Sequence, residues 1–152
     1  MNKLIERLIS IDQLNKIKYQ INDYSPIYIQ GLGDGSKSHL AYSLFELLRQ
    51  NIVIVAENTK RAEKYLDDLN QLSNYIQYYP SLDTNFYNIK SIDDQKSNKR
   101  LETLINLTKG KNFITVTSIA AIRNKLTTID KFNQSFVTLD EESLVDVSDF
   151  TN

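Results

Sequence analysis

Cysteine and tryptophan are absent from this 152-residue chain, and histidine occurs once, at His39. Without cysteine, the chain can form neither disulfides nor thiolate metal sites. A single histidine excludes a metal cluster built from several imidazoles, and it leaves only His39 as the base of any Ser/His/Asp triad. We expect His39 to be a solvated helix residue. The sequence therefore indicates no catalytic residue and no metal site.

An excess of either charge is also missing, because 18 basic and 19 acidic residues give a net charge of -1. Tight binding to nucleic acid requires a basic footprint, so we do not expect the chain to bind DNA tightly by itself. No apolar run is long enough to span a membrane. The first residues carry Lys3, Glu6 and Arg7 and so lack a signal-peptide run. These absences predict a cytoplasmic protein with no membrane partner.

Short apolar runs alternate with segments of helical period, which is typical of a parallel sheet covered by helices. We predict strands at 27–30, 52–56, 76–79 and 113–117, with a further one at 134–139. The predicted fold is a three-layer α/β domain with a mostly parallel sheet of four or five strands and helices on both faces. Its expected organisation is N-terminal helices at 1–24, the α/β domain at 25–133, and the start of a following domain at 134–152.

A glycine-rich loop connects the first predicted strand to a helix expected to begin at Ser36. A working phosphate loop reads glycine, four residues, glycine, lysine, then serine or threonine. Gly31, Lys37 and Ser38 match three of the four fixed positions, and Gly35 precedes Ser36, which replaces the second glycine. The strand, loop and helix together indicate a P-loop domain of RecA-like topology.

Two interpretations of this degenerate loop compete. In the first, Lys37 and Ser38 still hold a nucleotide. In the second, the loop keeps its turn but has lost its ligand, and we favour this one. A side chain at Ser36 would crowd the phosphate, and Asp34 adds negative charge to a loop that should bind an anion.

Two other charged groups admit both a functional and an ordinary interpretation. Asp140 and Glu141 follow an apolar run, as do the carboxylates that hold Mg²⁺ in P-loop ATPases, but acidic residues also commonly follow a strand. Lys96, Lys99 and Arg100 lie close together on a predicted helix. Because acidic residues dilute them, we expect an ordinary solvated helix face.

The order of several segments resembles one known family. After the degenerate loop come the turn Tyr79-Pro80-Ser81-Leu82-Asp83, the helix Arg100-Leu101-Glu102-Thr103-Leu104, the strand end Val116-Thr117-Ser118, and Phe132. Over about residues 25–145, this order is similar to the N-terminal, UvrB-like module of bacterial transcription-repair coupling factors. Phe86-Tyr87 departs from the Pro-Tyr of that family, and the interval from Tyr79 to Asp93 is too short for the DNA-gripping hairpin of UvrB.

The resemblance implies a fragment of a large ATP-driven DNA translocase that displaces stalled RNA polymerase and recruits UvrA in nucleotide excision repair. ATP and Mg²⁺ would act in a C-terminal motor, through which the full-length protein would also contact DNA. The UvrB-like module would be a scaffold and interaction module, without a cofactor and without hydrolysis at its phosphate loop. The alternative is an active P-loop NTPase with an atypical loop.

Overall fold

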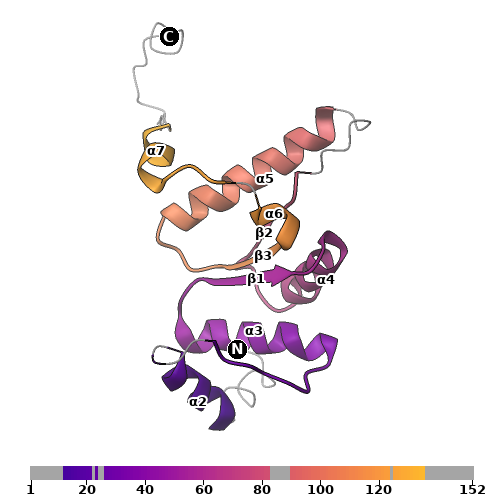
Figure 1. The fold of residues 1–152 in the computed structure, drawn as a ribbon, viewed down its shortest axis with the longest axis vertical. Helices are drawn as coiled ribbons and strands as arrows, with labels where there is room; N and C mark the ends of the chain where they lie inside the picture. The colour runs from indigo at the N-terminus through magenta and orange to yellow at the C-terminus, as the bar shows by residue number, and fades with distance from the viewer. Residues whose placement is uncertain (1–11, 22, 24–25, 83–89, 124, 136–152) are drawn as a thin grey trace, which may run out of the picture.

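The computed structural model describes residues 12–21, 23, 26–82, 90–123 and 125–135 (Figure 1). In chain order the elements are α2 (Asp12–Gln20), α3 (Asp34–Leu48), β1 (Ile52–Ala56), α4 (Thr59–Asn70), β2 (Ile76–Tyr79), α5 (Lys90–Thr108), β3 (Ile114–Ser118), α6 (Ile119–Ile122) and α7 (Ile129–Gln134). None of the helices in these ranges is long and apolar enough to cross a membrane.

The described sheet has three parallel strands in the order β1-β3-β2. Ile114 at the start of β3 lies between Ile52 of β1 and Ile76 of β2, so the last strand in the chain occupies the centre. All five residues of β3 are buried, as expected for a strand with neighbours on both edges and helices on both faces. The parallel α/β class and these three strands are therefore confirmed.

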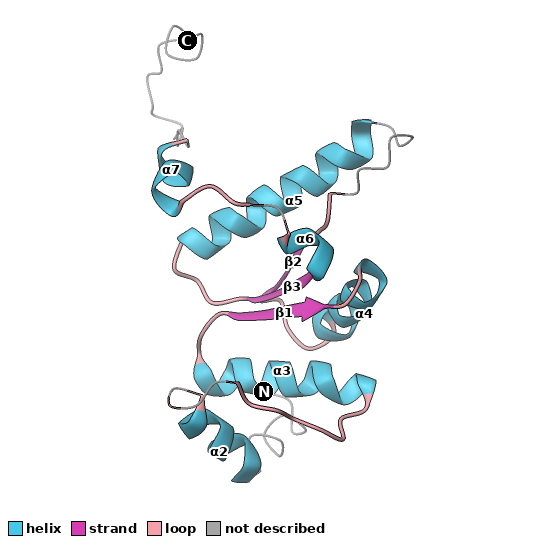
Figure 2. Ribbon diagram, viewed as in Figure 1, coloured by secondary structure: helices cyan, strands magenta, loops and turns pink. Residues whose placement is uncertain are grey.

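Helices cover both faces of the sheet, as Figure 2 shows for α3 and α5. On one face, Ala56, Ile114 and Val116 form a buried core with Phe45 of α3 and with residues of α4. On the other face, α5 contacts β2, where the Arg100 guanidinium lies 4.0 Å from the centre of the Tyr79 ring. This arrangement gives the three layers that the alternating pattern predicts.

The strand predicted at 27–30 is not part of the described sheet, so this prediction is wrong. The described sheet has three strands, not the four or five predicted. Residues 26–30 are irregular, and Figure 1 shows the chain before α3 running alongside that helix rather than beside β1. Tyr28 is 86% exposed and Ile29 is 43% exposed, so this apolar run is not buried. Apolar composition favours a strand only where the segment pairs with a sheet edge, and residues 26–30 run alongside α3 instead.

Two other predictions fall largely outside the described part of the chain. Residues 1–11 belong to the predicted N-terminal helices, of which the structure describes α2. Residues 136–139 belong to the further predicted strand, and Asp140 and Glu141 follow them. Gln134, where that strand was expected to begin, is instead the last residue of α7.

Candidate phosphate-loop site

The glycine-rich loop leads directly into α3, which begins at Asp34, two residues before the predicted start at Ser36. Gly31 has a φ of 81°, a left-handed conformation that glycine adopts without strain, and Gly33 is the N-cap. Gly35, Ser36 and Lys37 consequently lie in the first turn of the helix. The loop is thus shorter than the phosphate-loop motif predicts.

The backbone amide of Ser36 is already occupied within this turn. It donates a hydrogen bond of 3.1 Å to the carbonyl of Gly33. A phosphate loop binds its ligand with successive amides that point into a common hollow, and an amide bonded within the helical turn does not contribute to such a hollow. The Ser36 side chain is exposed, so it can be accommodated in this conformation.

Three basic side chains surround the carboxylate of Asp34. The Lys37 Nζ lies 3.5 Å from Oδ1, the Lys64 Nζ lies 3.8 Å from Oδ2, and the Arg61 guanidinium donates a hydrogen bond to Oδ1. Arg61 and Lys64 belong to α4, so Asp34 connects the start of α3 to the start of α4, just after β1. We call these four residues the Asp34 cluster.

Asp34 and Arg61 shift each other's pKa values. The hydrogen bond from Arg61 is the largest cause that lowers the pKa of Asp34 below its ordinary 3.8, and Lys37 lowers it further. The hydrogen bond with Asp34 in turn raises the pKa of the Arg61 guanidinium. Asp34 is therefore a carboxylate at neutral pH, and it supplies an internal anion to the lysine of the phosphate-loop motif.

Ser38 is turned away from the loop. Its side chain is 1% exposed, and its Oγ donates a hydrogen bond of 3.2 Å to the Asp68 Oδ2 of α4. In a working phosphate loop, the hydroxyl at this position binds Mg²⁺. Within the described ranges, no group of three or more His, Cys, Asp or Glu side chains could hold a metal ion.

His39 and Arg100 differ from what the sequence predicts, because both are more buried than expected. His39 is half-buried, and its Nδ1 has no hydrogen-bond partner among the described residues. Arg100 is 8% exposed, and its Nη1 donates to the carbonyl of Pro80 at 2.8 Å and to that of Ala121 at 3.3 Å. The solvated face predicted for residues 96–100 is therefore wrong at Arg100. Composition could not reveal the two carbonyls, because they lie on other elements.

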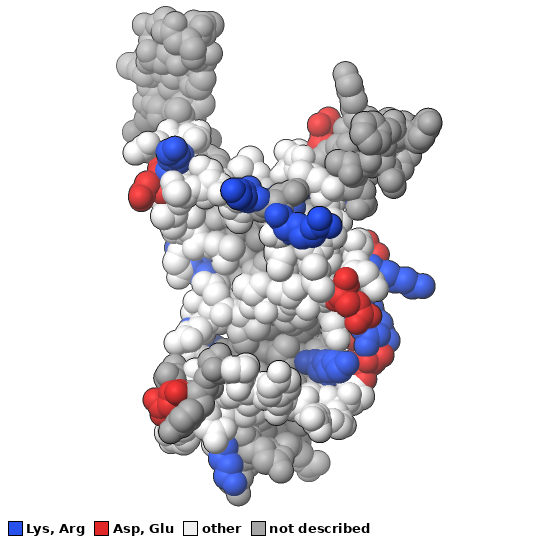
Figure 3. All heavy atoms as spheres, in the orientation of Figure 1, with Lys and Arg blue, Asp and Glu red and all other residues white. Residues whose placement is uncertain are grey.

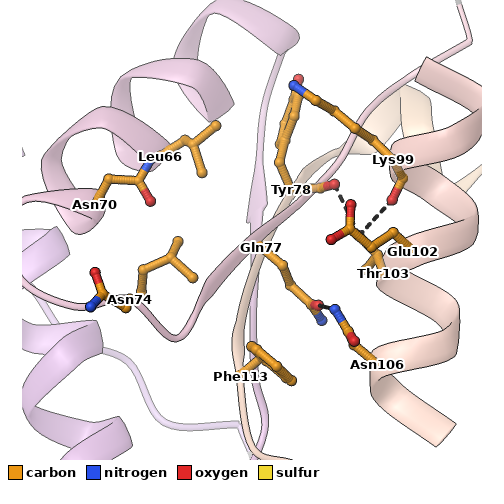
Figure 4. Close-up of a pocket in the computed structure, with 11 residues that line it drawn as sticks. Leu66, Asn70, Asn74, Gln77, Tyr78, Lys99, Glu102, Thr103, Asn106 and Phe113 are labelled. Atoms are coloured by element: carbon orange, nitrogen blue, oxygen red, sulfur yellow. Dashed lines mark hydrogen bonds between the residues drawn. The ribbon is translucent and has the colours of Figure 1, made fainter. Parts of the chain in front are cut away.

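A polar groove of about 340 Å³ lies on the outer side of β2, between α4 and α5 (Figure 4). Amide side chains line much of it: Asn70, Asn74, Gln77 and Asn106. The Asn106 Nδ2 donates to the Gln77 Oε1 at 3.3 Å, and the Gln77 Nε2 donates to the Thr115 Oγ1 at 2.8 Å. These bonds hold Gln77 between β3 and α5, so part of the polar lining serves the fold.

Charge on the visible surface is mixed. Figure 3 shows basic and acidic side chains interspersed on the face that it draws, with no broad basic area. The Asp34 cluster is one such mixture, since its one carboxylate neutralises part of the charge of three cations. This mixed surface matches the near-neutral composition.

Comparisons with known proteins identify no relative: no family model, no curated protein and no solved structure matches the chain.

Sequence reasoning identified Lys37, Ser38 and Asp34 but missed their partners on α4. Arg61 and Lys64 are three positions apart and so share one helix face, which could have indicated a small basic face. Asp68 extends the same face by one turn. No local pattern shows that this face packs beside the start of α3, because the contact joins residues that are distant in the chain.

Proposed function

We propose that the chain is the UvrB-like N-terminal module of a transcription-repair coupling factor, and that it acts as a non-catalytic scaffold with a vestigial phosphate loop. The observation that carries the non-catalytic part is the Asp34 cluster. Lys37 is the motif residue that would contact a triphosphate, and its ammonium instead lies beside the carboxylate of Asp34. A nucleotide would have to compete with this carboxylate for the same cations.

Two further features support the loss of nucleotide binding. The early start of α3 leaves the Ser36 amide bonded to Gly33, and the buried Ser38 hydroxyl is directed to Asp68. Phosphate affinity in such loops depends on convergent amides and on a metal-binding hydroxyl. Neither is arranged for a ligand, so the loop functions as a packing junction between α3 and α4.

The family part of the proposal rests on the order of segments in the sequence. In that family, UvrA, RNA polymerase and DNA are partners of the full-length protein, and ATP with Mg²⁺ acts in its motor. Reading the encoding gene beyond Asn152 tests the assignment. Helicase motor motifs downstream would support it, whereas an open reading frame without them would remove it.

Titration with a fluorescent ATP analogue and Mg²⁺ tests the vestigial loop. We expect no saturable binding in the micromolar range and no phosphate release by the wild-type chain. The rival function, an active NTPase, predicts micromolar binding that Lys37→Ala abolishes. Lys60→Ala is the matched control, because Lys60 is an exposed lysine at the start of α4 and lies outside the Asp34 cluster. Binding that disappears in Lys37→Ala and persists in Lys60→Ala would establish the rival.

A further inference from the structure

The outer edge of β1 has no strand beside it in the described sheet, because β1 pairs only with β3. The Ile52 amide donates to the Phe113 carbonyl at 3.0 Å, so the backbone groups of Ile52, and by alternation those of Ile54 and Ala56, face β3. The N–H and C=O groups of Val53 and Val55 therefore point outward. This edge offers a regular row of donors and acceptors.

Among the residues that the structure describes, the β1 edge also lacks the protection that sheet edges normally carry. Natural edge strands use charged side chains, proline, bulges or covering segments to prevent pairing with another strand. β1 reads Ile-Val-Ile-Val-Ala, and Val53 and Val55 are 57% and 47% exposed. On the outer edge of β2, by contrast, the Thr103 hydroxyl lies 3.0 Å from the Tyr78 carbonyl, and it shares its one proton between this carbonyl and that of Lys99 at 2.9 Å. In the described sheet, the β1 edge is thus the one that presents an unguarded apolar strand.

We propose that the β1 edge is a dimer interface, at which β1 pairs antiparallel with β1 of a second copy about a two-fold axis midway between Ile54 and the partner's Ile54. In this register Val53 lies opposite the partner's Val55, and each such pair exchanges both of its N–H···O=C bonds. The exposed valine side chains of both copies meet on one face of the joined sheet. The same contact thus gives the outward backbone groups hydrogen-bond partners and buries the apolar side chains of the edge.

Charge at the edge is compatible with a second copy. The same two-fold axis places Asn51, whose Oδ1 accepts a hydrogen bond of 2.8 Å from the Phe113 amide, opposite the partner's Glu57, so no two like charges oppose each other. Asn51 and Glu57 are both exposed, and the strand between them carries no charge. A net charge of -1 also adds little repulsion between copies. This inference does not depend on the proposed function.

Sedimentation equilibrium over a range of concentrations measures the association. We expect a monomer–dimer equilibrium that Val53→Pro weakens at least tenfold, because proline removes an outward N–H without touching the ladder to β3. Ile76→Pro is the matched control: it removes an N–H that faces outward on the β2 edge, and it should leave the dimer intact. Val55→Lys, which places a charge on the edge, should weaken the dimer as Val53→Pro does.

Disulfide trapping tests the register directly, since the chain contains no cysteine. Residues in a hydrogen-bonded antiparallel pair have Cα atoms about 5.5 Å apart, within the range that a disulfide spans. We expect a mixture of Val53→Cys and Val55→Cys chains to cross-link several times more than either variant alone. A chain that stays monomeric at every concentration, a dimer that tolerates both Val53→Pro and Val55→Lys, or equal cross-linking in the mixture and the single variants would each overturn the proposal.

Discussion

Arg100 joins α5 to the segments that follow β2 and β3, and its removal should destabilise the fold more than any other loss of a charged side chain described above. The Nη1 donates to the carbonyls of Pro80 and Ala121, at 2.8 Å and 3.3 Å. The guanidinium also lies over the Tyr79 ring, 4.0 Å from its centre. The side chain is only 8% exposed, so water cannot readily replace these contacts. We predict that Arg100→Ala lowers the free energy of unfolding.

The expected size of this effect follows from the separate contacts. A hydrogen bond from a charged donor contributes about 1.5–3 kcal/mol, and the longer bond to Ala121 contributes less than the bond to Pro80. A desolvated cation–π contact adds about 1–2 kcal/mol. Because such contributions are not additive, we expect Arg100→Ala to cost about 3–4 kcal/mol. Arg100→Lys keeps the charge but loses the planar fork, and it should cost about 1–2 kcal/mol.

Urea unfolding followed by circular dichroism measures these losses from the transition midpoint and slope. The neighbouring Lys99→Ala is the matched control, because Lys99 is exposed and its loss should change the free energy of unfolding by less than about 0.5 kcal/mol. A double-mutant cycle with Tyr79→Leu should give a coupling of about 1 kcal/mol between ring and guanidinium. The reasoning is refuted if Arg100→Ala unfolds with the same midpoint as Lys99→Ala.

Three further predictions concern a side-chain hydrogen bond, a helix cap and the pKa of a carboxyl group. Thr103→Val removes the hydroxyl that lies 3.0 Å from the Tyr78 carbonyl and 2.9 Å from the Lys99 carbonyl, and it should cost about 1 kcal/mol in urea unfolding. Thr103→Ser keeps the hydroxyl and should retain most of this stability. Asn58→Ala removes the N-cap of α4 and should cost about 1 kcal/mol, with Asn58→Asp as a tolerated control; equal midpoints for both would contradict the cap. In an NMR titration, Asp34 should have a pKa below 3.8 that rises in Arg61→Gln. Because folding lowers the pKa of Asp34, its carboxylate stabilises the folded chain at pH values above 3.8, and this stabilisation is lost as the pH falls through the lower pKa of the folded state. An unchanged Asp34 pKa in Arg61→Gln would show that the guanidinium does not cause the shift.

Local sequence patterns predicted much of the fold because the interactions that form these elements involve residues close together in the chain. The continuous apolar run at Ile52–Ala56 predicted β1, and β-branched residues favour a strand wherever a neighbour is present. Asparagine is favoured at the N-cap of a helix, and the Asn58 Oδ1 accepts a hydrogen bond of 2.8 Å from the Arg61 amide at the start of α4. Glycine is favoured just after the end of a helix, and Gly110 follows α5 with a φ of 70°. Each of these features is decided within a few residues of the chain.

The features that sequence could not predict depend on distant partners. The strand expected at 27–30 has the right composition, but composition does not show that this segment runs alongside α3 and not in the sheet. Ser38 matches the phosphate-loop motif, yet Asp68, thirty positions away, determines where its hydroxyl points. Arg100 sits among charged residues as a solvated side chain would, and only the folded chain brings the Pro80 and Ala121 carbonyls to it.

The central position of β3 has a consequence for how the chain folds. Residues of β1 and β2 have no hydrogen bonds to each other in the described sheet and meet only through β3. During synthesis, both earlier strands must therefore wait until Ile114–Ser118 has left the ribosome before either can form its ladder. Pairings between distant segments form slowly and leave apolar strands uncovered in the meantime. We expect nascent chains that stop before residue 114 to be prone to aggregation and to need chaperones.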